Sequence, residues 1–247
     1  SAIVKTLRGS GLVRDKRKYK INDNYFQEIN SETRAYFLGL LLADGCNYQD
    51  FLIKISLSSK DRYILESFLR DADSDYKIAD YATKKGDTVS NMSVVSVVSR
   101  KMIADLLKFE FHQRKSGTMK MPQDIIDNEY FRHFIRGYFD GDGCIQLRFE
   151  NRKTYKLRAS IEGTQEFLNS LSEFLIKKLG VKKTAIYKRR DNEFNAYSLR
   201  ISSNVDCYNF FSFIYDTNSN LFLKRKKDKF DTFKTTPSCQ NTYSKIQ

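Results

Sequence analysis

Residues 37–45 read Phe-Leu-Gly-Leu-Leu-Leu-Ala-Asp-Gly, and residues 134–143 read Phe-Ile-Arg-Gly-Tyr-Phe-Asp-Gly-Asp-Gly. Each stretch ends an apolar run with helical spacing, so each is predicted to close a helix. Small residues stand four apart on one face of each helix, at Gly39 and Ala43 and at Gly137 and Gly141. They let two helix backbones approach closely, which would offset the cost of about 1 kcal/mol that a glycine adds inside a helix. We therefore expect the two helices to pack against each other.

Both stretches finish on Asp-Gly, at Asp44 and Asp142. A carboxylate in the last turn of a helix faces the negative end of the helix dipole, which disfavours it by about 0.3–1 kcal/mol. A bound divalent cation would reverse that preference. One Asp-Gly at a helix end ordinarily marks only a turn, but two copies in matching helices indicate a shared function.

The same order of elements surrounds each motif. In the first half we expect helices at 31–44, 61–72 and 100–109, and strands at 51–58, 76–82 and 88–98. In the second half we expect helices at 128–141, 165–179 and 204–215, and strands at 145–150, 155–162, 183–190 and 194–202. The motif aspartates are 98 residues apart (142 minus 44). The chain is therefore predicted to be an α+β protein of two pseudo-symmetric αββαββα half-domains.

The predicted boundaries are a basic N-terminal extension at 1–30, a first half-domain at 31–120, a second at 121–232 and a C-terminal tail at 233–247. The extension has a Gly-Ser-Gly break and many lysines and arginines, which indicates a flexible arm that contacts phosphates. The alternative is the end of a helix-turn-helix unit belonging to a longer natural chain.

The composition favours a polyanionic partner. The 247 residues include 43 Lys and Arg against 30 Asp and Glu, a formal net charge of +13, which is typical of nucleic-acid-binding surfaces and also of ordinary basic proteins with a solvated surface. The four cysteines are widely spaced and there are two histidines, which argues against a structural zinc site and favours a reduced, intracellular protein. No apolar run approaches the ~20 residues of a membrane helix, so no membrane partner is expected.

These features resemble the LAGLIDADG homing endonucleases, in their single-chain form with two motifs. The resemblance rests on both nine-residue motifs, on their spacing and on the order of elements, and it covers most of residues 31–232. In that family the eighth motif residue is the acidic metal ligand, which here corresponds to Asp44 and Asp142. The sixth, Leu42 in one copy and Asp140 in the other, is not the essential one. The resemblance implies a monomeric, metal-dependent endonuclease that cuts double-stranded DNA at a long asymmetric target and leaves 3′ overhangs.

The resemblance also implies a basic residue near each centre, after the last helix of each half. Segments 112–116 and 223–227 share Arg-Lys, so Lys115 and Lys226 are the predicted catalytic lysines. They would stabilise the negative charge that develops on the phosphate. The alternatives to Lys226 are Lys224 and Lys227, and the competing interpretation is a solvated, charged turn.

The expected cofactor is Mg²⁺, with Mn²⁺ or Ca²⁺ able to substitute for binding. Asp44 and Asp142 would hold it beneath the minor groove, and the carbonyls of Ala43 and Gly141 would complete the coordination.

The open faces of the two predicted sheets would form a saddle along the major groove. Arginine and glutamine on such a face can read base edges, whereas lysine mainly holds phosphates. The candidate DNA-binding residues are Lys54 and Lys77 in the first half, and Gln146, Arg148, Lys156, Arg158, Lys188, Arg190 and Arg200 in the second.

The main competing hypothesis is a non-cleaving nucleic-acid binder of the same fold, either an intron RNA maturase or a DNA-binding regulator. The presence of both motif aspartates favours cleavage. A self-splicing intein has little room beyond the two halves, and a histidine- or zinc-based nuclease is poorly supported by two isolated histidines.

Overall fold

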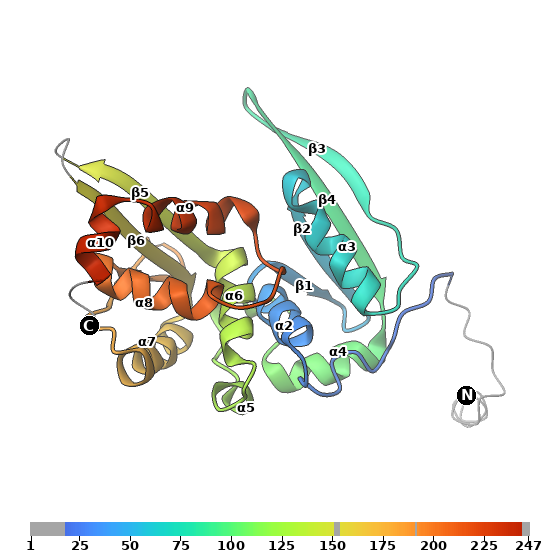
Figure 1. Ribbon diagram of the computed structural model, residues 1–247. Coiled ribbons are helices and arrows are strands. Elements are labelled where there is room, and N and C mark those ends of the chain that lie inside the picture. The colour runs from blue at the N-terminus through green and yellow to red at the C-terminus, as the bar shows by residue number, and fades with distance from the viewer. Residues whose placement is uncertain (1–17, 151–153, 191, 244–247) are drawn as a thin grey trace.

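Two sheets lie on either side of a central pair of helices (Figure 1). The computed structural model describes residues 18–150, 154–190 and 192–243. Within these residues no helix is both long enough and apolar enough to cross a membrane. Residues 1–17 of the predicted N-terminal extension at 1–30 lie outside the described part.

The first half carries a four-stranded antiparallel sheet in the order β1-β2-β4-β3. Its first helix is capped by Ser31, whose hydroxyl accepts the Arg34 N–H. The elements are α2 (Glu32–Asp44), β1 (Gly45–Tyr48), β2 (Leu52–Ser58), η1 (Ser59–Asp61), α3 (Arg62–Asp71), β3 (Ala79–Lys85), β4 (Thr88–Val98), α4 (Arg100–Leu106), η2 (Leu107–Phe109) and η3 (Lys115–Gly117).

The second half repeats this plan with a sheet in the order β5-β6-β8-β7. Helices α7 and α8 pack on one face of that sheet and leave the other face open. The elements are α5 (Gln123–Ile126), α6 (Phe131–Asp142), β5 (Gly143–Glu150), β6 (Thr154–Gly163), α7 (Gln165–Leu179), β7 (Ala185–Lys188), β8 (Tyr197–Ile201), α8 (Asn204–Tyr215), α9 (Lys224–Lys234) and α10 (Pro237–Tyr243). The predicted pair of αββαββα halves is confirmed.

The motif helices α2 and α6 pack backbone to backbone, as predicted. A Cβ atom added to Gly39 would lie 2.0 Å from the Phe134 carbonyl oxygen, and one added to Gly137 would lie 1.9 Å from the Tyr36 carbonyl oxygen. At the end of the same face, a Cβ on Gly141 would meet the Cβ of Ala43 at 2.3 Å. The glycines therefore exist because the helix crossing leaves no room for a side chain.

Several elements differ from the sequence-based expectation, and three of them bear on the site or the sheets. Strand β1 was not expected, because it has four residues and follows the motif helix without a turn. Strand β3 begins at Ala79 instead of 76, which removes Lys77 from the strand. No helix was expected at the position of α9, whose first four residues are all Lys or Arg.

The segments next to the predicted half-domains belong to the cores. Among residues 18–30, Ile21, Tyr25, Phe26 and Ile29 are buried, and the Tyr25 hydroxyl donates to Asp71 on α3. At the other end, the predicted boundary at 232 falls inside α9, and α10 packs on α8 and α9. Apolar burial therefore extends beyond the expected boundaries at both ends of the described chain.

Candidate active site and nucleic-acid interface

The two motif aspartates meet at the place where α2 and α6 end. Asp44 is exposed and Asp142 is half-buried. A Cβ atom on Gly141 of α6 would lie 3.2 Å from a carboxylate oxygen of Asp44, so the Asp44 carboxylate lies against the opposite motif helix. The glycine at this position makes room for it.

The surrounding protein disfavours ionisation of both carboxylates. Burial, followed by the charge of Asp44, raises the pKa of Asp142 from 3.8 to about 7. The protein atoms that crowd the Asp44 carboxyl also raise its pKa by displacing water, although part of the residue remains exposed to solvent. The cation that most opposes the rise is Lys115 for Asp142 and Lys226 for Asp44. Both lysines therefore contribute positive charge to both aspartates.

Both predicted lysines are buried at the ends of the motif helices. The ammonium nitrogen of Lys115 lies 3.2 Å from the Ala43 carbonyl oxygen and 2.8 Å from that of Gly45. Lys115 is only 7% exposed, and Lys226 only 5%. A cation there neutralises carbonyls that the helix leaves unpaired. The interpretation of either lysine as a solvated turn residue is therefore excluded by its position.

Lys226 makes the matching contacts in the second half. Its ammonium donates to the carbonyl oxygens of Phe139 at 2.6 Å and Asp140 at 2.7 Å, and also to that of Gly143. Burial lowers its pKa from 10.5 to about 8. The alternatives lie elsewhere, since Lys227 pairs with Asp231 and Lys224 stands over the ring of Tyr63.

Oxygen atoms are the donors available to a metal ion. Across the described residues there is no cluster of three or more His, Cys, Asp or Glu side chains that could hold one. Two adjacent carboxylates, with main-chain carbonyls beside them, form a hard-oxygen donor set that fits Mg²⁺, Mn²⁺ or Ca²⁺. Of the predicted carbonyl ligands, that of Ala43 already accepts Lys115, which leaves it one lone pair for a metal.

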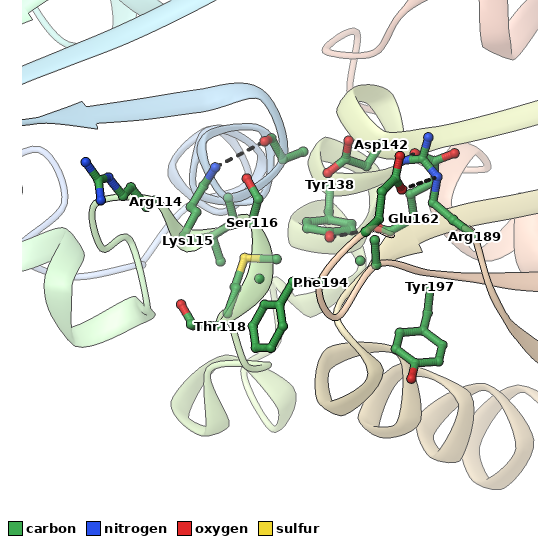
Figure 2. A pocket seen from close by; sticks show the side chains of 17 residues that line it. Arg114, Lys115, Ser116, Thr118, Tyr138, Asp142, Glu162, Arg189, Phe194 and Tyr197 are labelled. Atoms are coloured by element: carbon green, nitrogen blue, oxygen red, sulfur yellow. Dashed lines mark hydrogen bonds and ion pairs between the residues drawn. The ribbon is translucent and has the colours of Figure 1, made fainter. Parts of the chain in front are cut away.

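A pocket of about 530 Å³ opens beside Asp142 and Lys115. Figure 2 shows Glu162 and Arg189, joined as an ion pair, on the Asp142 side of this pocket and the Phe194 ring below it. Glu162 was not predicted from the sequence as a residue of this pocket. The available signal was its position as the last polar residue of β6, the second strand after the second motif, on the same face as Ser160.

Asp140 stands at the sixth motif position, where the first motif has Leu42, and it has a structural role of its own. Its buried carboxylate accepts the Tyr36 hydroxyl at 2.7 Å and the Leu223 N–H at 2.8 Å. Burial raises its pKa. Asp140 therefore links the first motif helix to the segment that carries Lys226.

Most of the predicted DNA-binding residues of the second half share the open face of its sheet. The register places Gln146 opposite Arg158, and Arg148 opposite Lys156, on the same face as Arg200. A second hollow of about 490 Å³ on this face is also lined by Lys188 and Arg190. Lys188 pairs with Tyr197, one residue out of phase with this face, at the end of its strand.

The first half offers a different surface. Lys54 pairs with Cys46 and Ser96 on the open face of the first sheet. Lys77 instead lines a hollow beside α3, with Arg62 and Glu66, so the structure does not bring it together with Lys54. The two open faces carry different side chains, as expected for an asymmetric target.

A family model described as a LAGLIDADG-like domain matches residues 129–215. Among curated proteins, the chain is 26% identical over 79% of its length to a probable translation initiation factor IF-2 of Methanocaldococcus jannaschii. It is 28% identical over 45% of its length to a DNA polymerase of Thermococcus hydrothermalis. The aligned segments span only 16% and 7% of those two proteins, so their names describe much longer molecules.

Solved structures of the same fold match most of this chain. The homing endonuclease I-WcaI bound to its DNA recognition sequence matches with a TM-score of 0.58 and 16% identity, over 83% of this chain and 90% of that one. I-DmoI in complex with DNA and Ca matches with a TM-score of 0.50 and 18% identity, over 85% and 99%. Full-length DUF199/WhiA from Thermatoga maritima matches with a TM-score of 0.50 and 17% identity, over 91% and 69%. This chain therefore carries the two-motif, single-chain LAGLIDADG fold, with a LAGLIDADG-like domain as its second half.

Proposed function

We propose that this protein is a site-specific, double-stranded DNA endonuclease that acts as a monomer and depends on a divalent metal ion. The observation that carries the proposal is the meeting of Asp44 and Asp142 at the helix crossing, with the buried Lys115 and Lys226 held at the ends of the same two helices. Two carboxylates whose ionisation is disfavoured form a site that a cation would stabilise.

The metal, Mg²⁺ by preference, would polarise the scissile phosphates and activate water. Asp44 and Asp142 would hold it, and the carbonyl of Gly141 is the candidate for a further oxygen donor. Lys115 and Lys226 supply fixed positive charge at the two ends of the motif helices, where charge develops on the phosphates. Burial keeps both ammonium groups in place before DNA arrives.

The open sheet faces would bind the duplex, with each sheet covering one side of the cut. Arg148, Lys156, Arg158 and Arg200 give the second sheet a dense row of cations, which suits phosphate contact and readout of guanine. Because the first sheet differs, the target is expected to be long and asymmetric. Products with 3′ overhangs would follow from cuts across the minor groove, as the family resemblance implies.

The rival is a DNA- or RNA-binding protein of the same fold that does not cut. The match to DUF199/WhiA, whose name does not describe a homing endonuclease, keeps it open. A randomised duplex library incubated with the protein, with Mg²⁺ or with EDTA, separates the two. Metal-dependent cuts within one long motif would support the endonuclease. Binding without cuts in Mg²⁺ or Mn²⁺ would favour the rival, and intron RNA would then be tested as its ligand.

Substitution of the carboxylates sharpens the test. Asp44→Asn and Asp142→Asn should each abolish double-strand cutting while the affinity for the selected target is largely preserved. Wild-type cutting rates in either variant would contradict the metal assignment.

A further inference from the structure

The segments that carry the two lysines are each fastened to the opposite half of the protein. We propose that Tyr63 and Asn195 are positioning residues that act across the interface: Tyr63 of the first half holds Lys226, and Asn195 of the second half holds Lys115. The proposal rests on the proposed function, because it concerns the two strand cuts that these lysines would serve.

Tyr63, on α3, grips the segment just before Lys226. Its hydroxyl donates to the Phe222 carbonyl oxygen at 2.8 Å and accepts the Lys224 N–H at 2.8 Å. Beside it, the Arg225 guanidinium lies 2.9 Å from the Asp61 carboxylate, whose side chain is 4% exposed. Three contacts from the first half therefore set the entrance to α9, two residues before Lys226.

These contacts influence the position of the Lys226 ammonium through the first turn of α9. The Lys226 N–H donates to the Leu223 carbonyl at 2.9 Å, so the position of its backbone follows that of residues 222–225. The ammonium must reach the carbonyls of Phe139 and Asp140 at the end of α6. A displacement of the turn would move it away from them, and errors of about 1 Å at a reacting centre can cost as much as 10²-fold in rate.

Asn195, in the loop between β7 and β8, does the corresponding work for Lys115. Its side-chain amide donates to the Gly117 carbonyl oxygen at 2.9 Å. The backbone of Asn195 itself is left-handed, with φ of 46°. Lys115 and Gly117 lie in the same single turn, η3. The Thr164 hydroxyl, also in the second half, donates to the Met119 carbonyl just beyond it. Loss of the Asn195 amide would loosen this turn at its far end.

The experiment measures the two strand cuts separately. A supercoiled plasmid carrying the selected target is cut under single-turnover conditions in Mg²⁺, and the rate at each strand is followed from the nicked and linear products. Lys226→Ala and Lys115→Ala assign each lysine to the strand that it serves. Tyr63→Phe removes only a hydroxyl. Asn195→Asp replaces the amide donor by a carboxylate oxygen, which also faces the Glu166 carboxylate that the amide contacts at 3.0 Å.

Tyr63→Phe should slow the Lys226 strand by roughly three- to tenfold, the effect of losing a hydrogen bond that positions a reacting group, and Asn195→Asp should slow the Lys115 strand similarly. In a Lys226→Ala background, Tyr63→Phe should add almost nothing, because the group that it positions is gone. In a Lys115→Ala background, Tyr63→Phe should still slow the cutting of the strand that Lys226 serves. A general loss of stability would show neither pattern.

Each variant has a matched control within one half. The Tyr76 hydroxyl accepts the N–H of Val98 at 3.1 Å and donates to its carbonyl at 3.4 Å. The Asn204 side chain accepts the Leu157 N–H and donates to the Tyr155 carbonyl, both at 2.9 Å. Tyr76→Phe and Asn204→Asp lose comparable hydrogen bonds, and neither residue contacts the segments that carry Lys115 and Lys226. Neither variant should therefore slow one strand more than the other.

Equal slowing of both strands, slowing of the wrong strand, or rates matching the control variants would overturn the proposal. If Tyr63→Phe fails to fold, Asp61→Asn, which breaks the ion pair to Arg225, is expected to slow the same strand. Failure of the wild-type protein to cut at all in Mg²⁺ and Mn²⁺ is a different result: it would overturn the proposed function and this inference with it.

Discussion

Asp142→Asn should make the metal-free protein more stable at neutral and alkaline pH. Burial and Asp44 raise the pKa of Asp142 from 3.8 to about 7, and one pKa unit corresponds to about 1.36 kcal/mol. The ionised carboxylate therefore costs the metal-free fold up to about 4 kcal/mol above pH 7. Asparagine keeps the size of the side chain and removes the charge, so the variant avoids this cost.

The effect has a defined pH window. The unfolded chain releases the Asp142 proton near pH 3.8, whereas the folded protein keeps it to about pH 7. The folded state binds more protons between these values, so the free energy of unfolding falls as the pH rises from about 4 to about 7. His133 changes in the opposite direction, because burial lowers its pKa from 6.5 to about 4. The difference between wild type and Asp142→Asn removes the contribution of His133.

The assay is urea unfolding in EDTA, repeated between pH 4 and pH 8, for the wild type, for Asp142→Asn and for Asp228→Asn, which replaces an exposed carboxylate on α9. The advantage of Asp142→Asn should grow with pH, while Asp228→Asn should follow the wild type. Added Mg²⁺ should then stabilise the wild type more than Asp142→Asn. Parallel pH curves for wild type and Asp142→Asn, or equal stabilisation by Mg²⁺, would refute the reasoning.

Three further predictions concern packing and binding. Gly137→Ala should destabilise the fold by about 1–3 kcal/mol, because the added Cβ would lie 1.9 Å from the Tyr36 carbonyl oxygen. This cost should outweigh the better helix propensity of alanine. Thermal unfolding measures the effect, and a rise in Tm would contradict the close crossing. Arg148→Gln combined with Lys156→Gln should reduce the slope of log affinity against log salt by about 2, measured by titration of the selected duplex. Removal of residues 1–17 should weaken binding and flatten the same slope, whereas unchanged affinity and slope would rule out a phosphate-contacting arm.

The helix crossing could be predicted because its causes are local in the sequence. Gly39 and Gly137 mark the places where the two helices leave no room for a side chain. The alternation of apolar and polar residues in β2, β5 and β6 indicates which face of each sheet the helices cover. Repetition then turned two weak signals into one strong one, since a single Asp-Gly says little and a matched pair says much.

The parts that were missed depend on contacts between distant residues. Helix α9 was hidden because its first turn is entirely basic, although Lys226, Phe230 and Phe233 are spaced on one face and are all buried. A lysine among apolar residues of that stripe was the available signal. Tyr63 and Asn195 gave no signal at all, because nothing near them in the sequence marks the carbonyls that they reach.

The structure also explains why two similar halves in one chain could come to differ. Each lysine lies at the end of its own motif helix, yet its segment is fastened by the opposite half through unrelated groups: a tyrosine hydroxyl on one side and an asparagine amide on the other. Substitution in one fastening therefore acts on one centre without a compensating change in the other. Asp140 adds to this inequality, because its carboxylate ties Tyr36 to Leu223 where the first motif has Leu42. Two centres supported so differently are expected to cut their strands at different rates, and a nicked intermediate with one strand preferentially cut is the observation that would show it.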